Sequence, residues 1–256
     1  MQIDTTVTPP TTRLFVIGGG VSGPATARNP QTVETIDLTT LGGTTAWESP
    51  AQSMSFPRTN VNAVLLPDGT VFIVGGQRAG KWAVDPQPVL DAEILDPTAS
   101  PATFTVTPPM AFPRQYHSIA VLLPDGRVLS AGGVDPANPT ERDQRSMEVF
   151  SPPYLDAGPR PVISAAPASA TYGSVVSVAT PDSAGVAEVV LIRPNSVTHH
   201  TDAGHRLIRL PIVATTAGGV DVRLPANGAI APPGPYMLFI VDGDRIPSAA
   251  RFITIT

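Results

Sequence analysis

The sequence predicts an all-β protein, with a partial β-propeller first and a β-sandwich after it. Pro 30 and Gly 22 together make about a fifth of the 256 residues, whereas Lys+Arg 16 and Asp+Glu 21 are few. This composition favours short strands and tight turns over helices. Apolar residues make up 42% of the chain, so it has the material for a core that a disordered chain lacks. A repeat in the first part and a different strand spacing in the second complete the prediction.

Three β-rich runs in the first 135 residues end in a glycine pair, and the pairs lie 57 residues apart. The runs are Leu14–Gly19, Val71–Gly76 and Val128–Gly133. In two of the copies, a strand enters a Pro-Asp-Gly turn just before the glycine run, at Leu65–Gly69 and Leu122–Gly126. Each of these pairs of strands is therefore predicted to form a hairpin.

Each repeat also contains further strands. A third strand is expected at Glu34–Asp37, Glu93–Asp96 and Glu148–Ser151, and a fourth around Trp47 and at Phe104–Thr107. Four short antiparallel strands per period are typical of a kelch-type propeller blade. We therefore predict two to three blades over residues 1–155. Propellers typically close with 4–8 blades, so this arc leaves edges and apolar faces uncovered and points to missing blades or self-association.

After a proline-rich connector from Ser151 to about Val162, the strand spacing changes. Short strands rich in Val, Ile and Thr are expected at Ser174–Thr180, Val186–Arg193, Val220–Leu224, Tyr236–Asp242 and Ala249–Ile255. This spacing predicts an immunoglobulin-like sandwich of about a hundred residues, which we place at residues 156–256.

Composition also excludes several classes of function. The net charge is −5 and no Lys/Arg cluster is present, which argues against nucleic acid and anionic membranes as partners. The longest apolar runs, such as Tyr236–Val241, are too short to span a bilayer. Met1–Thr6 lacks the features of a secretory signal. With Cys 0, disulfides and cysteine-based sites are excluded.

One glycine motif resembles a nucleotide-binding fingerprint. Gly18, Gly20 and Gly23 fit G-x-G-x-x-G after a strand. That site needs a helix at the phosphate, but Pro24 stands where the helix would start and Pro30 would interrupt it. The glycine pair also recurs twice without a phosphate loop, so we interpret it as the end of a strand.

Tyr116 and His117 are candidates for chemistry because they break the repeat. The copies Phe56–Gly69 and Phe112–Gly126 share their pattern, but the second gains a residue and the Tyr-His pair. Scaffold positions do the same packing in each copy and should look alike. A phenol and an imidazole found in one copy only are therefore candidates for chemistry and not for packing.

Three of the four histidines lie within seven residues, in what we interpret as a loop at Arg193–Arg206. Exposed loop histidines often have no specific role, and that interpretation stays open. Imidazole is also a common ligand of copper and zinc. His199 with His117 and the Tyr116 phenolate would form an N,N,O set suited to tetragonal Cu(II). A zinc site of His199, Asp202 and His205 is the weaker alternative. Trp47 and Trp82 are interpreted as structural.

Four separated motifs resemble the C-terminal part of the galactose oxidase and glyoxal oxidase family of copper-radical oxidases. They are Phe112–Val128, Glu148–Leu155, Val197–His199 and Pro232–Phe239, and they occur in the family's order over nearly the whole chain. The resemblance implies a seven-bladed kelch propeller followed by an immunoglobulin-like early-set domain, a loop of which reaches the propeller axis. It also implies an extracellular location.

The resemblance further implies a site and a reaction. Tyr116 would be the axial copper ligand and the base that takes the substrate hydroxyl proton, and His117 and His199 would be equatorial ligands. The substrate would be a small primary alcohol, an aldehyde or a carbohydrate, oxidised by two electrons while dioxygen becomes hydrogen peroxide. Copper takes one electron and a tyrosine cross-linked to a cysteine takes the other. This chain has no cysteine, so it cannot form that cross-link. The family's Gln-Arg pair after the loop is His205-Arg206 here.

Two hypotheses from different classes follow. In the first, the chain is the C-terminal portion of an oxidase that has lost its N-terminal blades, and it is inactive alone. In the second, it is a natural non-catalytic module that binds carbohydrate or protein. We favour the first, because Tyr116, His117 and His199 would have no reason to persist together in a binding module.

Overall fold

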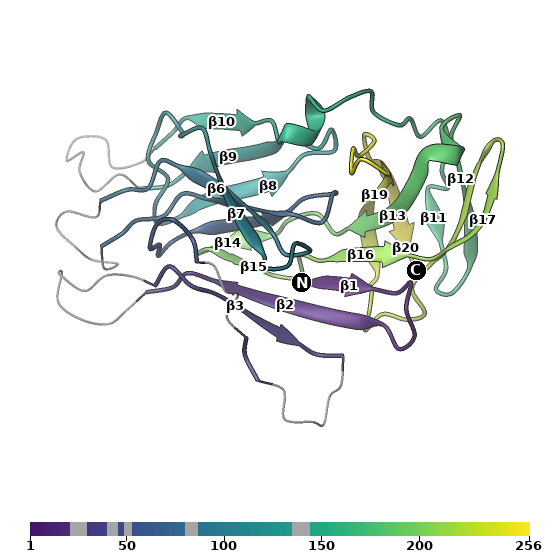
Figure 1. The fold of residues 1–256 in the computed structure, drawn as a ribbon, viewed down its shortest axis with the longest axis horizontal. Helices are drawn as coiled ribbons and strands as arrows, with labels where there is room; N and C mark the ends of the chain where they lie inside the picture. The colour runs from purple at the N-terminus through teal and green to yellow at the C-terminus, as the bar shows by residue number, and fades with distance from the viewer. Residues whose placement is uncertain (21–29, 40–45, 49–52, 80–86, 135–143) are drawn as a thin grey trace.

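The computed structural model describes residues 1–256 except 21–29, 40–45, 49–52, 80–86 and 135–143 (Figure 1). The regular secondary structure of its described part is β-strands and two short 3₁₀ turns, η1 (Pro153–Leu155) and η2 (Ser183–Gly185). None of its helical segments has the length and apolar character needed to cross a membrane. The all-β prediction is confirmed: propeller-type sheets come first and a sandwich follows.

Three groups of antiparallel strands form the first part, and we call them the first, middle and last blade. The first blade contains β2 (Thr11–Ile17) and β3 (Val33–Asp37); the middle blade β4 (Asn62–Leu65), β5 (Val71–Val74), β6 (Ala92–Asp96) and β7 (Thr103–Thr107); the last blade β8 (Ser118–Leu122), β9 (Val128–Gly132) and β10 (Met147–Phe150). The predicted glycine-run and third strands are confirmed, as is the fourth strand of the middle blade. Around Trp47 there is only a bridge between Thr35 and Glu48.

The glycine pairs end their strands because neighbouring blades approach closely there. Gly18 and Gly75 both have positive φ, at 64° and 75°, a conformation that glycine adopts without a steric penalty. A Cβ on Gly18 would lie 2.5 Å from the Arg58 carbonyl oxygen, and one on Gly75 would lie 2.6 Å from that of Arg114. In the first two copies the glycine is thus required by the next blade. The rest of the G-x-G-x-x-G segment and Trp82 lie outside the described residues.

The second part packs two sheets face to face. One contains β11 (Ser169–Ala170), β20 (Arg251–Ile255), β19 (Gly234–Asp242), β13 (Val186–Ile192) and β16 (Leu207–Leu210), and the other β12 (Val175–Ala179), β18 (Gly219–Arg223) and β17 (Ile212–Thr216). The five predicted sandwich strands are confirmed; β16 and β17 were not predicted. Strands β13 and β19 are buried on both faces, with Leu191 and Leu238 in the sandwich core and Ile192 and Phe239 against the blades.

One strand connection crosses the predicted boundary between the two parts. Strand β1 (Gln2–Asp4) pairs in parallel with β16 and antiparallel with β2, so one eight-stranded sheet continues from the sandwich into the first blade. Sequence periodicity did not predict β1 or this pairing. The division of the chain at residues 155 and 156 stays a prediction.

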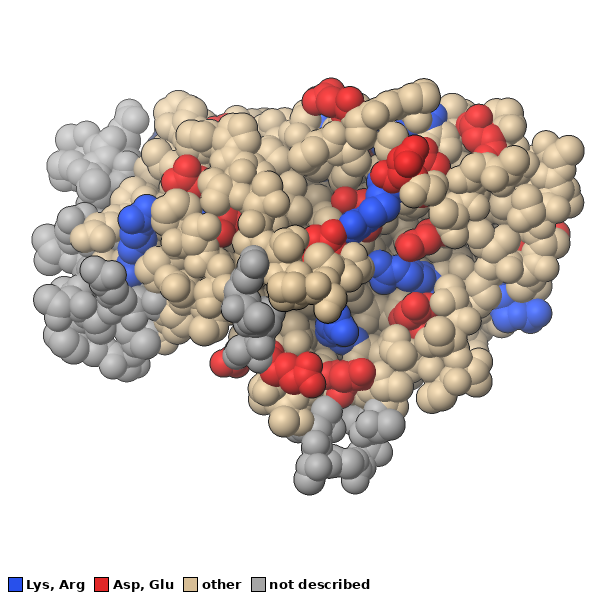
Figure 2. Space-filling view, in the orientation of Figure 1, with Lys and Arg blue, Asp and Glu red and all other residues tan. Residues whose placement is uncertain are grey.

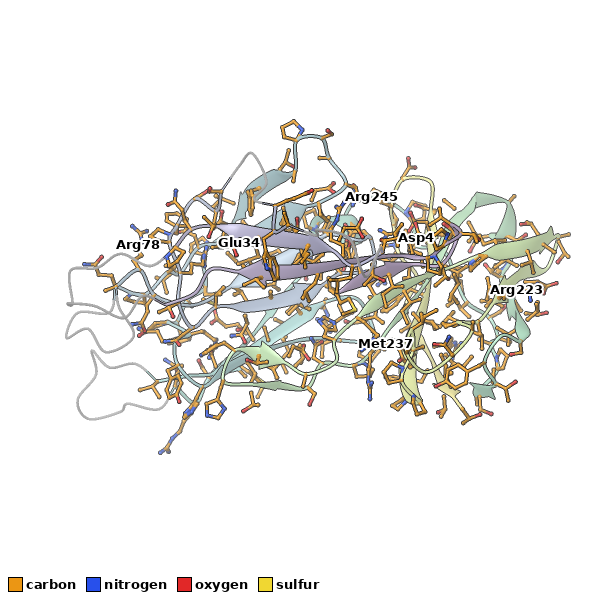
Figure 3. All side chains as sticks on the ribbon, turned by 90° about the horizontal axis from the view of Figure 1, so that it is seen from below. Asp4, Glu34, Arg78, Arg223, Met237 and Arg245 are labelled. Carbon is orange, nitrogen blue, oxygen red and sulfur yellow. The ribbon has the colours of Figure 1, made fainter. Side chains whose placement is uncertain are left out.

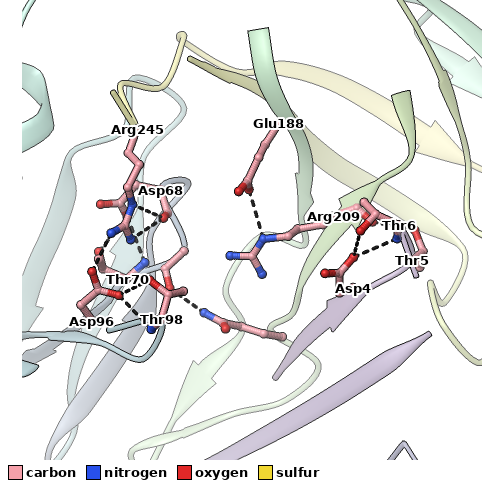
Figure 4. A network of polar contacts seen from close by, with 12 residues as sticks. Asp4, Thr5, Thr6, Asp68, Thr70, Asp96, Thr98, Glu188, Arg209 and Arg245 are labelled. Carbon is pink, nitrogen blue, oxygen red and sulfur yellow. Dashed lines mark hydrogen bonds and ion pairs between the residues drawn. The ribbon is translucent and has the colours of Figure 1, made fainter. Parts of the chain in front are cut away.

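Charged side chains join the blades to the sandwich. Figure 2 shows acidic and basic groups gathered where the two parts meet. The Arg245 guanidinium bonds the Asp96 carboxylate at 2.6 Å and the Asp68 carbonyl oxygen at 2.8 Å (Figure 4). Arg160 donates to three backbone carbonyls, of Asp125 in the last blade and of Pro247 and Ser248 in the sandwich. The sandwich loops are thereby held against the blades.

Candidate metal centre

Tyr116 and His117 form a turn just before the first strand of the last blade. The Ser118 amide donates to the Gln115 carbonyl oxygen at 3.0 Å, and His117 has a φ of 65°. Glycine or asparagine usually holds such a left-handed turn position. A histidine held there is strained, and strain of this kind concentrates at functional sites. The turn leaves Tyr116 half-buried and His117 exposed.

Arg114 anchors the turn to the blade beneath it. Its buried guanidinium donates to the Gly132 carbonyl oxygen at 3.1 Å, to the Ser146 carbonyl oxygen at 3.0 Å and to the Glu148 carboxylate at 3.0 Å. The Val134 amide then donates to the Tyr116 carbonyl oxygen at 2.8 Å. The two candidate side chains therefore stand on a fixed backbone.

The adjacent residues His199 and His200 form the tip of a hairpin. Strands β14 (Val197–Thr198) and β15 (Thr201–Asp202) pair antiparallel, with His199 and His200 as the two-residue turn. Their φ values are 51° and 62°, as in a type I′ turn, where Asn-Gly is the usual choice. The segment expected to be a loop is thus a hairpin, with imidazoles where small residues fit best.

A polar network holds the base of this hairpin against the last blade. The Asn195 side-chain amide donates to the Asp202 carboxylate at 2.6 Å, and its oxygen accepts a bond from the Leu122 amide at 2.8 Å. His205 Nδ1 lies 3.4 Å from the Asp202 carboxylate. Burial lowers the pKa of His205 to about 4, although the Asp202 charge opposes the shift. His205 is therefore a neutral, buried support, a role that sequence reasoning missed.

The hairpin brings His199 beside the Tyr-His turn. Strand β14 lies against β8, which immediately follows that turn in the chain. The ring centroids of Tyr116 and His117 are 3.8 Å apart, those of His117 and His199 4.7 Å, and those of Tyr116 and His199 5.9 Å. Three candidate residues from segments some 80 positions apart in the chain thus meet at one place.

The donor set of these three side chains suits copper. Two imidazoles and a phenolate supply N,N,O ligands, which Cu(II) accepts in tetragonal geometry. His199 Nδ1 lies 2.8 Å from the Thr198 hydroxyl oxygen. A hydrogen bond from that ring nitrogen would leave Nε2 as the ligand atom, the usual arrangement around metal-binding histidines. The residues present therefore fit a copper ion.

The zinc alternative does not hold in the described structure. Among the residues outside the five gaps, no three His, Cys, Asp or Glu side chains are grouped to hold a metal ion. Asp202 and His205 are neighbours at the hairpin base, but His199 is at its tip and does not join them. The rings that lie beside His199 are instead those of His117 and Tyr116.

Comparisons with known proteins identify the family of the chain. The family described as "Glyoxal oxidase N-terminus" matches residues 3–154, and the family "Galactose oxidase-like, Early set domain" matches residues 160–255. A galactose oxidase of Gibberella zeae is 34% identical over 80% of this chain, and the aldehyde oxidase GLOX of Vitis pseudoreticulata is 36% identical over 82%. A solved structure of a fungal alcohol oxidase of the AA5 family, in complex with copper, superposes on 95% of the chain with a TM-score of 0.84 and 29% identity.

The matches cover only part of each relative. The chain spans 30% of the galactose oxidase, 43% of the aldehyde oxidase and 51% of the fungal alcohol oxidase. It therefore corresponds to about a third to a half of these proteins.

Proposed function

Because the chain belongs to the galactose oxidase and glyoxal oxidase family, we propose that it is the C-terminal portion of a copper-radical oxidase, with Tyr116, His117 and His199 as copper ligands. One observation carries the proposal: a turn of the last blade and the tip of a sandwich hairpin bring these three rings within 3.8 to 5.9 Å of one another. Each histidine occupies a left-handed position, where packing alone would favour asparagine or glycine.

The residues have separate roles in this proposal. His117 and His199 would hold the ion through neutral imidazole nitrogens, and the Tyr116 phenolate would take the proton of the substrate hydroxyl. A bound copper ion supplies one-electron redox chemistry and polarises a substrate oxygen. The buried Arg114 and the Asn195, Asp202 and His205 network are positioning groups, because they hold the two ligand-bearing turns.

The reaction of the family needs a second electron acceptor. A primary alcohol loses two electrons and two protons to become an aldehyde, and dioxygen takes them up to become hydrogen peroxide. The cross-linked Cys-Tyr that accepts one of these electrons requires a cysteine, and Cys is 0 in this chain. We therefore expect the chain alone to bind copper but not to turn over a small alcohol, aldehyde or carbohydrate. From its family membership we infer that the protein is located outside the cell.

Copper titration followed by electron paramagnetic resonance tests the ligand set. The chain should give a tetragonal N/O signal. His199→Asn should abolish it, or weaken binding by about 100-fold or more, since a lost ligand matters at least as much as a lost outer-shell partner. Asparagine suits the turn, so this variant should stay folded.

His200→Asn is the matched control, because it changes the same turn and leaves the proposed ligands in place. It should keep the signal. An unchanged signal in His199→Asn, or equal losses in both variants, would refute the assignment.

Two measurements test the fragment hypothesis. The DNA upstream of Met1 should continue in frame with further Gly-Gly repeats and a cysteine codon; a promoter and start site there would contradict it. Peroxide release from glyoxal or galactose by the copper-loaded chain would contradict the expected inactivity.

The non-catalytic module is the second candidate, and the lack of cysteine favours it. It predicts carbohydrate or protein binding that survives both His199→Asn and removal of copper. If all carbohydrate or protein binding is lost when copper is removed, the oxidase hypothesis is favoured instead.

A further inference from the structure

The Tyr116 ring has three imidazole neighbours, and the proposed function uses only two of them. His117 stacks on it at 3.8 Å between ring centroids, and His199 lies edge-on at 5.9 Å. The third is His200, whose centroid is 6.2 Å from that of Tyr116 with 44° between the ring planes. Aromatic rings with centroids about 4.5 to 7 Å apart attract each other. His200 therefore packs against Tyr116 without being one of the proposed ligands.

His200 lies on the inner side of its hairpin. In Figure 1 and Figure 3 the green strands of this hairpin run from the sandwich alongside the blades, toward the end of the molecule where Figure 3 labels Arg78. His199 is exposed at the tip, whereas His200 is half-buried and both of its ring nitrogens are shielded from solvent. His200 also lines a cavity together with Val61 and Asn62, at the start of the middle blade. The two histidines of the turn therefore have different surroundings.

An imidazole at position 200 strains the backbone. His200 is the second residue of the turn and has a φ of 62°, where glycine is the usual residue because it has no Cβ. Strained positions persist when the surrounding structure holds them, and they concentrate at functional sites. The proposed copper ligation accounts for the strain at His199 but not for the strain at His200. The His200 ring therefore needs a separate explanation.

We propose that His200 is a positioning residue, which holds the Tyr116 ring in the orientation from which its phenolate oxygen reaches a copper ion bound by His117 and His199. The Tyr116 side chain turns about two single bonds and is half-buried, so packing must restrain it. A stacked neighbour such as His117 restrains a ring perpendicular to its plane and allows it to slide within that plane. A second neighbour that is tilted by 44°, as His200 is, restrains this sliding. The role rests on the proposed ligand set and adds the residue that fixes the phenolate.

Visible absorption of the copper-loaded whole chain tests this role, because a phenolate bound to Cu(II) gives a charge-transfer band in the visible range. The unmodified chain should show the band, and Tyr116→Phe should lack it. His200→Asn suits the turn and should keep the tetragonal N/O signal in electron paramagnetic resonance, since both ligand imidazoles remain. Its charge-transfer band should be weaker, because loss of one ring pair should lower the ratio of bound to unbound phenolate about 2- to 10-fold.

His200→Phe separates ring packing from other effects of the substitution. Phenylalanine restores a ring without ring nitrogens, so the folded variant should recover most of the band that His200→Asn loses. Thr201→Ala, at the next position of the hairpin, is the matched control and should leave the band unchanged. Circular dichroism checks the fold of each variant. A band of full intensity in His200→Asn would overturn the role, as would an equally weak band in folded His200→Phe or in Thr201→Ala.

A measurement without copper distinguishes this role from the ligand assignment. Tyr116 is one of four tyrosines, and Tyr116→Phe identifies its ring signals in NMR spectra of the chain labelled at tyrosine. In copper-free His200→Asn the Tyr116 ring should be more mobile by NMR relaxation, and in His200→Phe it should not. Unchanged mobility in His200→Asn would overturn the role of His200 and leave the copper ligands as proposed. Absence of the charge-transfer band in the unmodified chain would refute Tyr116 as a ligand and this role with it.

Discussion

The middle and last blades are built from the same repeat but differ in what surrounds them. The middle blade lies between two neighbours, and its Val64 and Phe72 side chains are almost inaccessible to solvent. In the described part of the chain the last blade packs against the middle blade, and its Met147 is 68% exposed. A blade sequence therefore specifies its strands, but the adjacent blade decides how much each side chain contributes to stability.

The same difference extends to an ion pair that occurs in each blade. Arg58 and Glu93 are 2.9 Å apart and both 0% exposed, whereas Arg114 and Glu148 are 3.0 Å apart with Glu148 23% exposed. Partial access to water lets an unpaired carboxylate be solvated. The equivalent mutations should therefore have unequal effects in the two blades.

The largest effect should come from breaking the ion pair of the middle blade. Arg58→Met leaves Glu93 buried without its cation and should lower the free energy of unfolding by about 3 to 5 kcal/mol. Arg114→Met should lower it by about 1 to 3 kcal/mol, because Glu148 is accessible to water. Urea denaturation measures both, and equal losses would show that the neighbouring blade does not matter.

Truncating equivalent valines in β4 and β8 should give the next largest difference. Val64→Ala opens a cavity in a closed interface and should cost about 2 kcal/mol. Val121→Ala, at the matching position of the last blade, should cost about 1 kcal/mol or less. The same denaturation experiment checks this, and a larger loss from Val121→Ala would contradict the comparison.

The tie between the middle blade and the sandwich should depend on pH. Although partial burial opposes the shift, hydrogen bonds from Arg245 and Thr98 lower the pKa of Asp96 to about 2. Since the pKa is lower in the folded state, its stabilisation is complete above the unfolded value of about 3.9 and is lost as pH falls towards 2.

For this partly exposed pair the loss should be about 1 kcal/mol or less. Urea denaturation between about pH 5 and 2 should show a shallower decline for Asp96→Asn. The tie of the last blade through Arg160 uses backbone carbonyls and should not titrate. Identical pH profiles for the variant and the unmodified chain would rule out this role of Asp96.

The smallest effect should appear in the turns that begin the two blades. Asn60 lies just before β4 of the middle blade and has a φ of 56°. His117 lies just before β8 of the last blade and has a φ of 65°. His117→Asn should raise stability by about 0.5 kcal/mol, and Asn60→His should lower it by a similar amount. His117→Asn should also lose copper binding. A loss of stability in His117→Asn would mean that the imidazole has a structural role.

Much of the fold could be predicted from local patterns. Glycine pairs and Pro-Asp-Gly turns mark strand ends by their backbone requirements, so the hairpins were placed correctly. Strands β16 and β17, between Leu207 and Thr216, were missed although they are apolar. The hairpin at Val197–Asp202 was also missed, because His199-His200 lacks the Asn-Gly signal of a two-residue turn.

The candidate site was only partly predictable. Tyr116 and His117 were found because a repeat predicts its own positions and these two depart from it. Sequence inspection could not identify the support from Asn195 and His205, since a buried histidine and an exposed one look the same in a sequence.

The sequence by itself determined the strand-rich character of the chain, the blade repeat and the lack of a cysteine for the radical cofactor, because these depend on residue type and spacing along the chain. Only the tertiary structure decided that His199 meets Tyr116 and His117, and that β1 joins the sandwich sheet to the first blade. It alone decided that Val64 and Phe72 are buried whereas Met147 is exposed. Such features depend on which surfaces pack together over long sequence separations. Side-chain periodicity describes local structure and does not identify which distant segments pack together.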